Sequence, residues 1–329
     1  MLALFRASRD VTTTPSAVLV LENAFGSPTS ATPAFSRDNT GIFSQPLEGS
    51  KPLEPHNRLF HLSHKTVHNG LSGNGLVDLA SRFMTLLEDE LSKLDVGDNW
   101  IDIPDFYSVI QHTVFKASTA ALCGPHLFEL NPDFTTDFWD FDTRMPGLFK
   151  NLPRWMIPKS FDVRDRLKSA ILKWHKYAND HLDLNDPELA KQEWEEFFGA
   201  KVMRDRQRDY SGIDGMNKEA LAANDLGMIW AANGNVVPII GWCLLDTLFR
   251  PELLSQVRDE ISSTVDTSQK DRFTLDMPKI LANPLLQSIY CEELRLRGSV
   301  MIQRVPVVST FKIGSWKFPK GKMVIASSR

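Results

Sequence analysis

The feature that most constrains the fold of this chain is a long apolar stretch, Leu226–Phe249, whose helical pattern breaks in the middle. The break carries Asn233, Gly234, Asn235 and Pro238. Proline has no amide hydrogen, so Pro238 cannot donate to the carbonyl four residues back, on Gly234. Glycine and proline destabilise the interior of a helix, and side-chain amides such as those of Asn233 and Asn235 destabilise a buried helix. Because such violations gather at functional sites, we expect a broken helix whose kink has a function.

The same stretch is long enough to cross a membrane as a helix kinked by proline. We favour a globular interpretation, because Asn233, Asn235 and Asp246 would lie at or near hydrocarbon and no second span exists. A composition of 42% hydrophobic and 24% charged residues is that of an ordinary soluble domain. The N-terminal MLALFRASRD has neither a signal-peptide core nor a membrane anchor.

Net charge and cysteine usage narrow the class of protein further. The formal net charge is -4 and basic residues form no long run, which argues against binding to nucleic acid. The cysteines Cys123, Cys243 and Cys291 are odd in number and widely spaced. We therefore expect reduced thiols rather than disulfides, and no metal-ligand cysteine pair.

The order of patterns along the chain predicts one mainly α domain with a small antiparallel β-sheet. Residues 1–58 are loop-rich with one short helix or strand, residues 59–298 are helical, and residues 299–329 form the small sheet. Helices are expected over residues 59–71, 75–94, 105–124, 163–182, 187–208, 251–261 and 284–297, besides the broken one. The aromatic segment 133–158 contains three prolines and is expected to be a flexible cover rather than a core element.

Glu292 and Arg295 lie three residues apart on a helix whose cap is Asn283. At that spacing the two side chains share a helix face and can form a bidentate pair. Alone, this is weak evidence, since such pairs are common on solvated surfaces. Here Arg304 follows on a strand, and then comes the turn Pro319–Gly321.

In that order, these residues resemble the cytochrome P-450 family, the haem-thiolate monooxygenases. The resemblance implies the fold of that family, incomplete at both ends. It also implies that Glu292 and Arg295 support the fold and that Arg304 binds a haem propionate. The expected function of the intact parent protein is oxidation of a hydrophobic substrate, sterol-like or otherwise lipophilic. Haem, dioxygen and an NADPH-dependent reductase are implied as well, with the parent in the endoplasmic reticulum membrane.

The resemblance also interprets the broken helix as the wall above the haem. The acid and threonine with which the family delivers protons fall on Gly234 and Asn235. The pattern looks like the branch with the sterol 7α- and 12α-hydroxylases and prostacyclin synthase. An amide holds water or a substrate oxygen but relays protons poorly, so Asn235 favours positioning, and the Gly234 carbonyl adds an acceptor. A kink filled by structural water is the alternative.

His64 and His68 are four residues apart on an expected helix, a spacing also used by zinc ligands. No cysteine or HExxH glutamate completes a metal site there. The resemblance instead implies that His68, and with a poorer match His64, contacts the haem propionates. A solvated basic patch is the alternative.

Three further residues are expected to line a hydrophobic substrate pocket: Met228, Val300 and Met301. Soft apolar side chains suit a lipophilic substrate, although core packing would explain them equally well. The aromatic segment resembles a substrate-access lid, with ordinary helix packing as the alternative.

The family's axial ligand is a cysteine thiolate in a loop containing phenylalanine and glycine. Cys123, Cys243 and Cys291 do not lie in such a loop, so we expect the axial cysteine beyond Arg329. We therefore expect an internal piece of a longer protein, without a membrane anchor and inactive alone. Two alternatives stay open: a haem-dependent isomerase or dehydratase that needs no reductase, and a non-catalytic fragment or helical protein with a histidine metal site.

Overall fold

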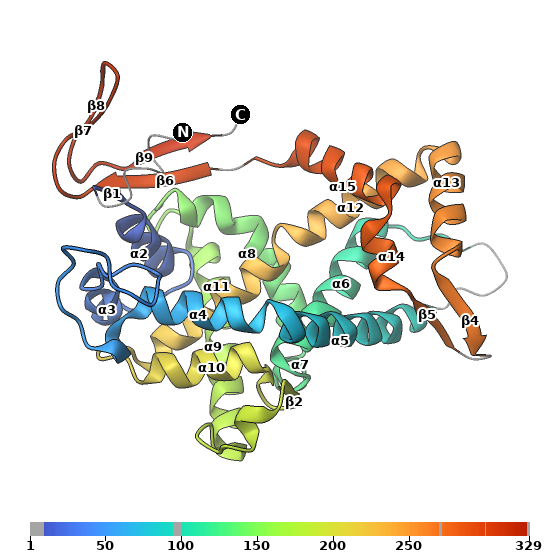
Figure 1. Cartoon of the computed structure of the whole chain (residues 1–329), viewed down its shortest axis with the longest axis horizontal. Helices are drawn as coiled ribbons and strands as arrows, with labels where there is room; N and C mark the ends of the chain where they lie inside the picture. Colours follow the sequence, from blue (N-terminus) through green and yellow to red (C-terminus); the bar gives the residue numbers. More distant parts are fainter. Residues whose placement is uncertain (1–9, 95–100, 270–271, 300, 328–329) are drawn as a thin grey trace. The chain divides into compact units, whose positions relative to one another are not determined.

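The computed structural model describes residues 10–94, 101–269, 272–299 and 301–327. They form two compact units. Figure 1 labels the helices and strands along the chain. The first holds the described residues up to Asp102, then His112–Asn233 and Ile302–Ala326. The second holds Ile103–Gln111, Gly234–Met301 and the end of the chain. The expected single domain thus remains a prediction, while the expected mainly α fold with small antiparallel sheets is confirmed.

The first unit is largely helical. Its helices are α2 (Thr14–Asn23), α3 (Thr32–Ser36), α4 (Leu59–Gly70), α5 (Gly73–Ser92), α7 (His126–Leu130), α8 (Phe134–Phe149), α9 (Pro158–His181), α10 (Lys201–Ser211) and α11 (Lys218–Asn233), with most of α6 (Phe106–Cys123). Short 3-10 turns lie at Thr29–Ala31, Pro55–Asn57 and Leu189–Lys191. The helix or strand expected around Val18 is α2.

The core of this unit is built from aromatic side chains of α6, α8 and α9. Phe115, Phe138, Phe141 and Trp174 are fully buried, and the rings of Phe115 and Phe138 stack with centroids 4.2 Å apart. The expectation that residues 133–158 form a flexible cover was wrong for α8. Its apolar residues recur at helical spacing, so they form one buried stripe despite Pro146.

The helix expected over residues 187–208 begins only at Lys201, because a two-stranded hairpin precedes it. In this hairpin β2 (Trp194–Glu195) pairs antiparallel with β3 (Gly199–Ala200). The Glu195 carboxylate accepts hydrogen bonds from the backbone N–H groups of Phe197 and Phe198, at 2.6 and 2.8 Å. A side chain that satisfies the backbone locally competes with helix formation, which the helical pattern did not reveal.

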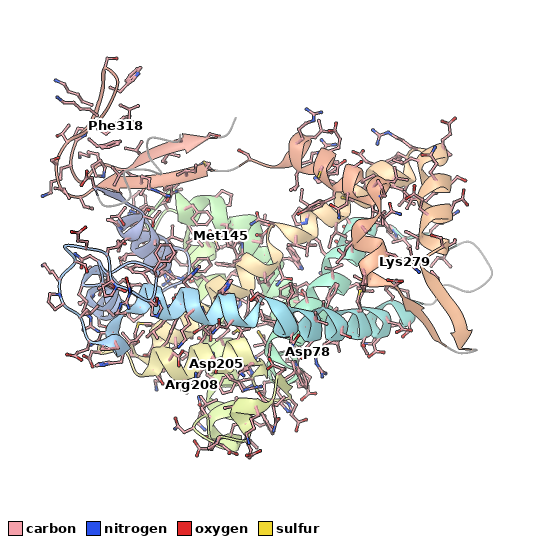
Figure 2. All side chains as sticks on the ribbon, in the orientation of Figure 1. Asp78, Met145, Asp205, Arg208, Lys279 and Phe318 are labelled. Carbon is pink, nitrogen blue, oxygen red and sulfur yellow. The ribbon has the colours of Figure 1, made fainter. Side chains whose placement is uncertain are left out.

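The C-terminal sheet predicted over residues 299–329 is present. Its strands are β6 (Met301–Pro306) and β9 (Val324–Ser327). Between them, β7 (Phe311–Ile313) and β8 (Trp316–Phe318) form a separate two-stranded hairpin that ends at Phe318 (Figure 2). The sheet order is β1-β6-β9, and β1 (Val11–Thr12) pairs antiparallel with β6. The N-terminal segment therefore completes this sheet.

The second unit contains α12 (Val236–Leu248), α13 (Pro251–Ser262), α14 (Met277–Ala282) and α15 (Pro284–Arg297). Between α13 and α14, β4 (Val265–Gln269) pairs antiparallel with β5 (Arg272–Leu275), a hairpin that the sequence did not predict. The Asn283 side chain accepts a hydrogen bond from the N–H of Leu286 at 3.0 Å. This is the N-cap expected from the Asn-Pro pair.

One segment of the described chain, Lys218–Leu248, is long and apolar enough to cross a membrane by length and composition. It comprises α11, the break and α12. Core helices of soluble proteins pass the same test, so the segment alone is weak evidence for a span.

Candidate active site

The break predicted in the apolar stretch is confirmed: α11 ends at Asn233 and α12 begins at Val236. Asn233 closes α11 with a buried amide that is 1% exposed. Its Nδ2 donates to the Ile229 carbonyl at 2.9 Å and to Thr119 Oγ1 at 3.2 Å, and its Oδ1 accepts from the Ser118 hydroxyl. Asn233 is thus a satisfied structural amide that ends α11 and ties it to α6.

Asn235 is the N-cap of α12, and its carbonyl accepts from the N–H of Ile239 at 3.4 Å. Pro238 is the third residue of α12, where backbone N–H groups have no partner within the helix. Restarting the helix at Val236 therefore removes the cost that Pro238 would impose in a helix interior. Gly234 is half-buried and Asn235 is exposed.

The Glu292–Arg295 pair on α15 has the predicted bidentate geometry. Arg295 Nε and Nη2 donate to the two carboxylate oxygens of Glu292, each at 2.7 Å. These hydrogen bonds lower the pKa of Glu292. Both side chains are more than half exposed, at 52% for Glu292 and 66% for Arg295. Water therefore screens this pair, and it adds little to the stability of the fold.

A second charged cluster links α12 to α15, and the sequence did not predict it. Glu293 is buried, and its carboxyl group shares a hydrogen bond with that of Asp246. Arg297 lies 3.4 Å from the Glu293 carboxylate and 3.6 Å from that of Asp246. Its guanidinium also lies 4.0 Å above the centroid of the Trp242 ring. Burial, followed by the nearby Asp246 carboxyl, raises the pKa of Glu293.

The predicted histidines lie on the exposed side of α4. The rings of His64 and His68 stack with centroids 5.9 Å apart and an interplanar angle of 13°. Within the part of the chain that the structure describes, neither imidazole has a hydrogen-bond or ion-pair partner, and no three metal-ligating side chains form a cluster. Both rings are therefore available to an external acceptor such as a carboxylate.

Arg304 lies on β6 and is half-buried. Its Nη1 donates to the Gln303 carbonyl at 2.8 Å. The Pro-Lys-Gly turn before β9 folds back onto the same strand, since the N–H of Gly321 donates to the Pro306 carbonyl at 2.8 Å. Arg304, His64 and His68 all belong to the first unit.

The described residues could bind the propionates of a haem but do not supply its axial ligand. The histidines and Arg304 are the kind of donors that bind propionates. The thiols do not supply a ready axial thiolate. Burial raises the pKa of Cys123 well above its usual value and raises that of Cys243, whereas Cys291 is exposed on α15 beside Glu292.

The three expected pocket residues are not brought together in one unit. Met228 is half-buried on α11, in the first unit. Met301 opens β6, belongs to the second unit and is 69% exposed. Val300 lies outside the described residues.

Comparison with known proteins supplies the family. The cytochrome P-450 family model matches residues 79–329. A cytochrome P-450 monooxygenase, efuG, from Hormonema carpetanum is 30% identical over 97% of this chain and 55% of its own length. Another, fsoE, from Humicola fuscoatra is 35% identical over 82% of this chain and 47% of its own. Cytochrome P-450 7A1 of Sus scrofa is a more distant match, 23% identical over 72% of this chain and 46% of its own length.

The fold agrees with the sequence matches. A solved zebrafish cytochrome P-450 structure with progesterone superposes with a TM-score of 0.58 at 16% identity, over 94% of this chain and 71% of the other. The chain spans about half the length of the curated relatives it matches. With its helix break, its Glu292–Arg295 pair and a family match over residues 79–329, the chain belongs to the cytochrome P-450 family.

Proposed function

We propose that the intact protein is a haem-dependent monooxygenase that acts on a hydrophobic substrate. The observation that supports this most strongly is the helix break at Gly234 and Asn235, in a chain whose residues 79–329 match the family. Relatives that carry the name monooxygenase support the same reaction class. When bound, haem would supply the activation of dioxygen.

In this proposal each polar residue has one task. His68, Arg304 and, with a poorer match, His64 hold the two propionates through charge-assisted hydrogen bonds. The Asn235 amide and the Gly234 carbonyl hold water or a substrate oxygen in place at the break. Because an amide transfers protons poorly, delivery of protons relies on water held there. Glu292 and Arg295 support the fold of the intact protein, as the family resemblance implies, although in this chain the pair is exposed to water and adds little to its stability.

The family implies a small-molecule substrate and an electron-supplying partner. Within the proposal the substrate is sterol-like or otherwise lipophilic, Met228, Val300 and Met301 contact it, and the partner is an NADPH-dependent reductase. The intact protein would work at the endoplasmic reticulum membrane. Asn235, which stands where the family has an alcohol, favours one second candidate: a haem-dependent isomerase or dehydratase that needs no reductase.

Titration of the purified chain with hemin tests the cofactor part. We expect His68→Ala and Arg304→Ala to weaken hemin binding roughly tenfold each, because each removes a charge-assisted hydrogen bond. Lys65→Ala is the matched control, an exposed cation on the same helix α4. Equal hemin affinity in all four proteins would contradict the proposed propionate contacts.

The reaction class has its own test in the intact protein. A monooxygenase requires reductase and NADPH for turnover of a lipophilic substrate, whereas product formation without either would establish the isomerase or dehydratase instead.

A further inference from the structure

Asp142 on α8 is a half-buried carboxylate to which the proposed function assigns no task. Its Oδ1 accepts a hydrogen bond from the Trp230 indole N–H on α11, at 2.8 Å. In the described part of the chain, Trp230 is its only polar partner, and no cation pairs with it. A carboxylate offers about four acceptor positions, so most of its capacity is unused.

The partner of Asp142, Trp230, belongs to an aromatic cluster. The centroid of the Trp230 ring lies 5.9 Å from that of Phe25, which follows α2, and 5.6 Å from that of Phe149 at the end of α8. Phe25 is buried, Trp230 is half-buried, and Phe149 is 41% exposed. We call these three rings the aromatic wall. All of its residues, and Asp142, belong to the first unit.

A purely structural role explains this arrangement poorly. If the contact only tied α8 to α11, a neutral amide would accept the indole hydrogen bond without placing a charge in a half-buried position beside the Trp230 ring. Burial raises the pKa of Asp142, and the single indole hydrogen bond only partly opposes this. Burial disfavours the ionised form of this carboxylate, and one of its oxygens has no partner among the described residues. Both features are typical of a carboxylate that binds a ligand.

We propose that Asp142 is a specificity-determining residue that accepts a hydrogen bond from a hydroxyl group on a flat apolar ligand stacked against the aromatic wall. The inference rests on the proposed function in taking this ligand to be the substrate. It narrows the substrate class to ring systems that carry a hydroxyl. Trp230 is a positioning residue, because its indole fixes Oδ1 and so directs Oδ2 to the ligand. Trp230 also lies four residues before Gly234, one turn of α11 from the break.

Equilibrium dialysis of the purified chain with two probes tests this inference. 2-Naphthol carries the hydroxyl donor, and 2-methoxynaphthalene has the same ring without the donor. We expect the chain to bind 2-naphthol about tenfold more tightly, because a hydrogen bond to a charged acceptor is worth roughly that factor. In Asp142→Asn this preference should fall to about one, while 2-methoxynaphthalene still binds.

Asp133→Asn is the matched control, the same substitution at the exposed N-cap of α8, and should keep the preference. Should Asp142→Asn fail to fold, Trp230→Phe keeps the acceptor and an aromatic ring, and should still lower the preference. An unchanged preference in Asp142→Asn would overturn the inference. Failure of both probes to bind the wild-type chain would also overturn it. Tighter binding of 2-naphthylmethylammonium than of 2-naphthol would overturn the hydroxyl assignment.

Hemin titration of the same proteins separates this inference from the proposed function. Asp142→Asn should bind hemin as the wild-type chain does. A change in probe preference with unchanged hemin binding supports the inference, and loss of hemin binding in His68→Ala bears only on the cofactor.

Discussion

At the residue scale, adjacent acids on α15 have opposite environments. Glu292 is exposed and paired with Arg295, which lowers its pKa, whereas burial raises the pKa of Glu293. Helix geometry turns neighbours by about 100°, so one side chain faces water and the other faces α12. The family's motif therefore sits beside a buried acid that the motif does not include.

Glu293→Gln should stabilise the chain at neutral pH and leave it nearly unchanged in acid. The folded-state pKa of Glu293 lies above its unfolded value of about 4.5, so its stabilising contribution is complete below that value and is lost as pH rises through the folded-state pKa. Glutamine mimics the protonated form at every pH. Urea unfolding at pH 4 and pH 7 measures the difference.

Glu292→Gln is the control on the same helix. Because the pKa of Glu292 is lowered, this substitution should not raise the urea midpoint at pH 7. Equal midpoint shifts in the two variants would contradict the assignment of the buried acid.

At the element scale, two glycines let α6 end against the β2–β3 hairpin. Gly124 follows α6 with φ +79°, and Gly199 in β3 has φ +77°. A Cβ on Gly199 would lie 2.4 Å from the Gly124 nitrogen and 2.5 Å from the Leu122 carbonyl oxygen. Backbone atoms cannot move aside as a flexible side chain can, so this packing requires glycine.

Gly199→Ala should destabilise the first unit by about 3 kcal/mol or more, from the left-handed backbone and the steric overlap together. Gly215→Ala is the matched control, since Gly215 has φ +86° but no atom within 4 Å of an added Cβ. It should cost only about 1 kcal/mol. Urea unfolding followed by circular dichroism measures both, and equal losses would show that backbone strain alone matters.

At the scale of the whole molecule, buried side chains are unevenly divided. The first unit contains most of the fully buried aromatic and aliphatic residues, whereas α12 and α15 of the second keep several large apolar side chains exposed, among them Trp242, Leu248 and Leu294. Local stability follows buried apolar contacts, so the two units should differ in how often they open.

Native-state hydrogen exchange should therefore show slower amide exchange in α8, α9 and α11 than in α12, α13 and α15. The comparison is internal, because all six helices belong to one chain under one condition. Equal protection factors in the two groups would mean that the chain opens as a single cooperative unit.

Periodicity predicted most helices, and capping residues predicted several of their ends, because these depend on neighbours in sequence. The helix break followed from Gly234 and Pro238, and the Glu292–Arg295 pair from a spacing of three. The burial of α8 was not predicted, because a segment rich in prolines and aromatic residues is consistent both with a surface lid and with a buried helix.

The sequence by itself thus determined the mainly α class, the break and the family motif, since each depends on local geometry or residue order. Only the tertiary structure decided that Glu293 meets Asp246, that Asp142 meets Trp230, and that β1 completes the C-terminal sheet. These partners are distant in sequence. Which distant side chains meet depends on how helices pack, and no spacing within one helix encodes that.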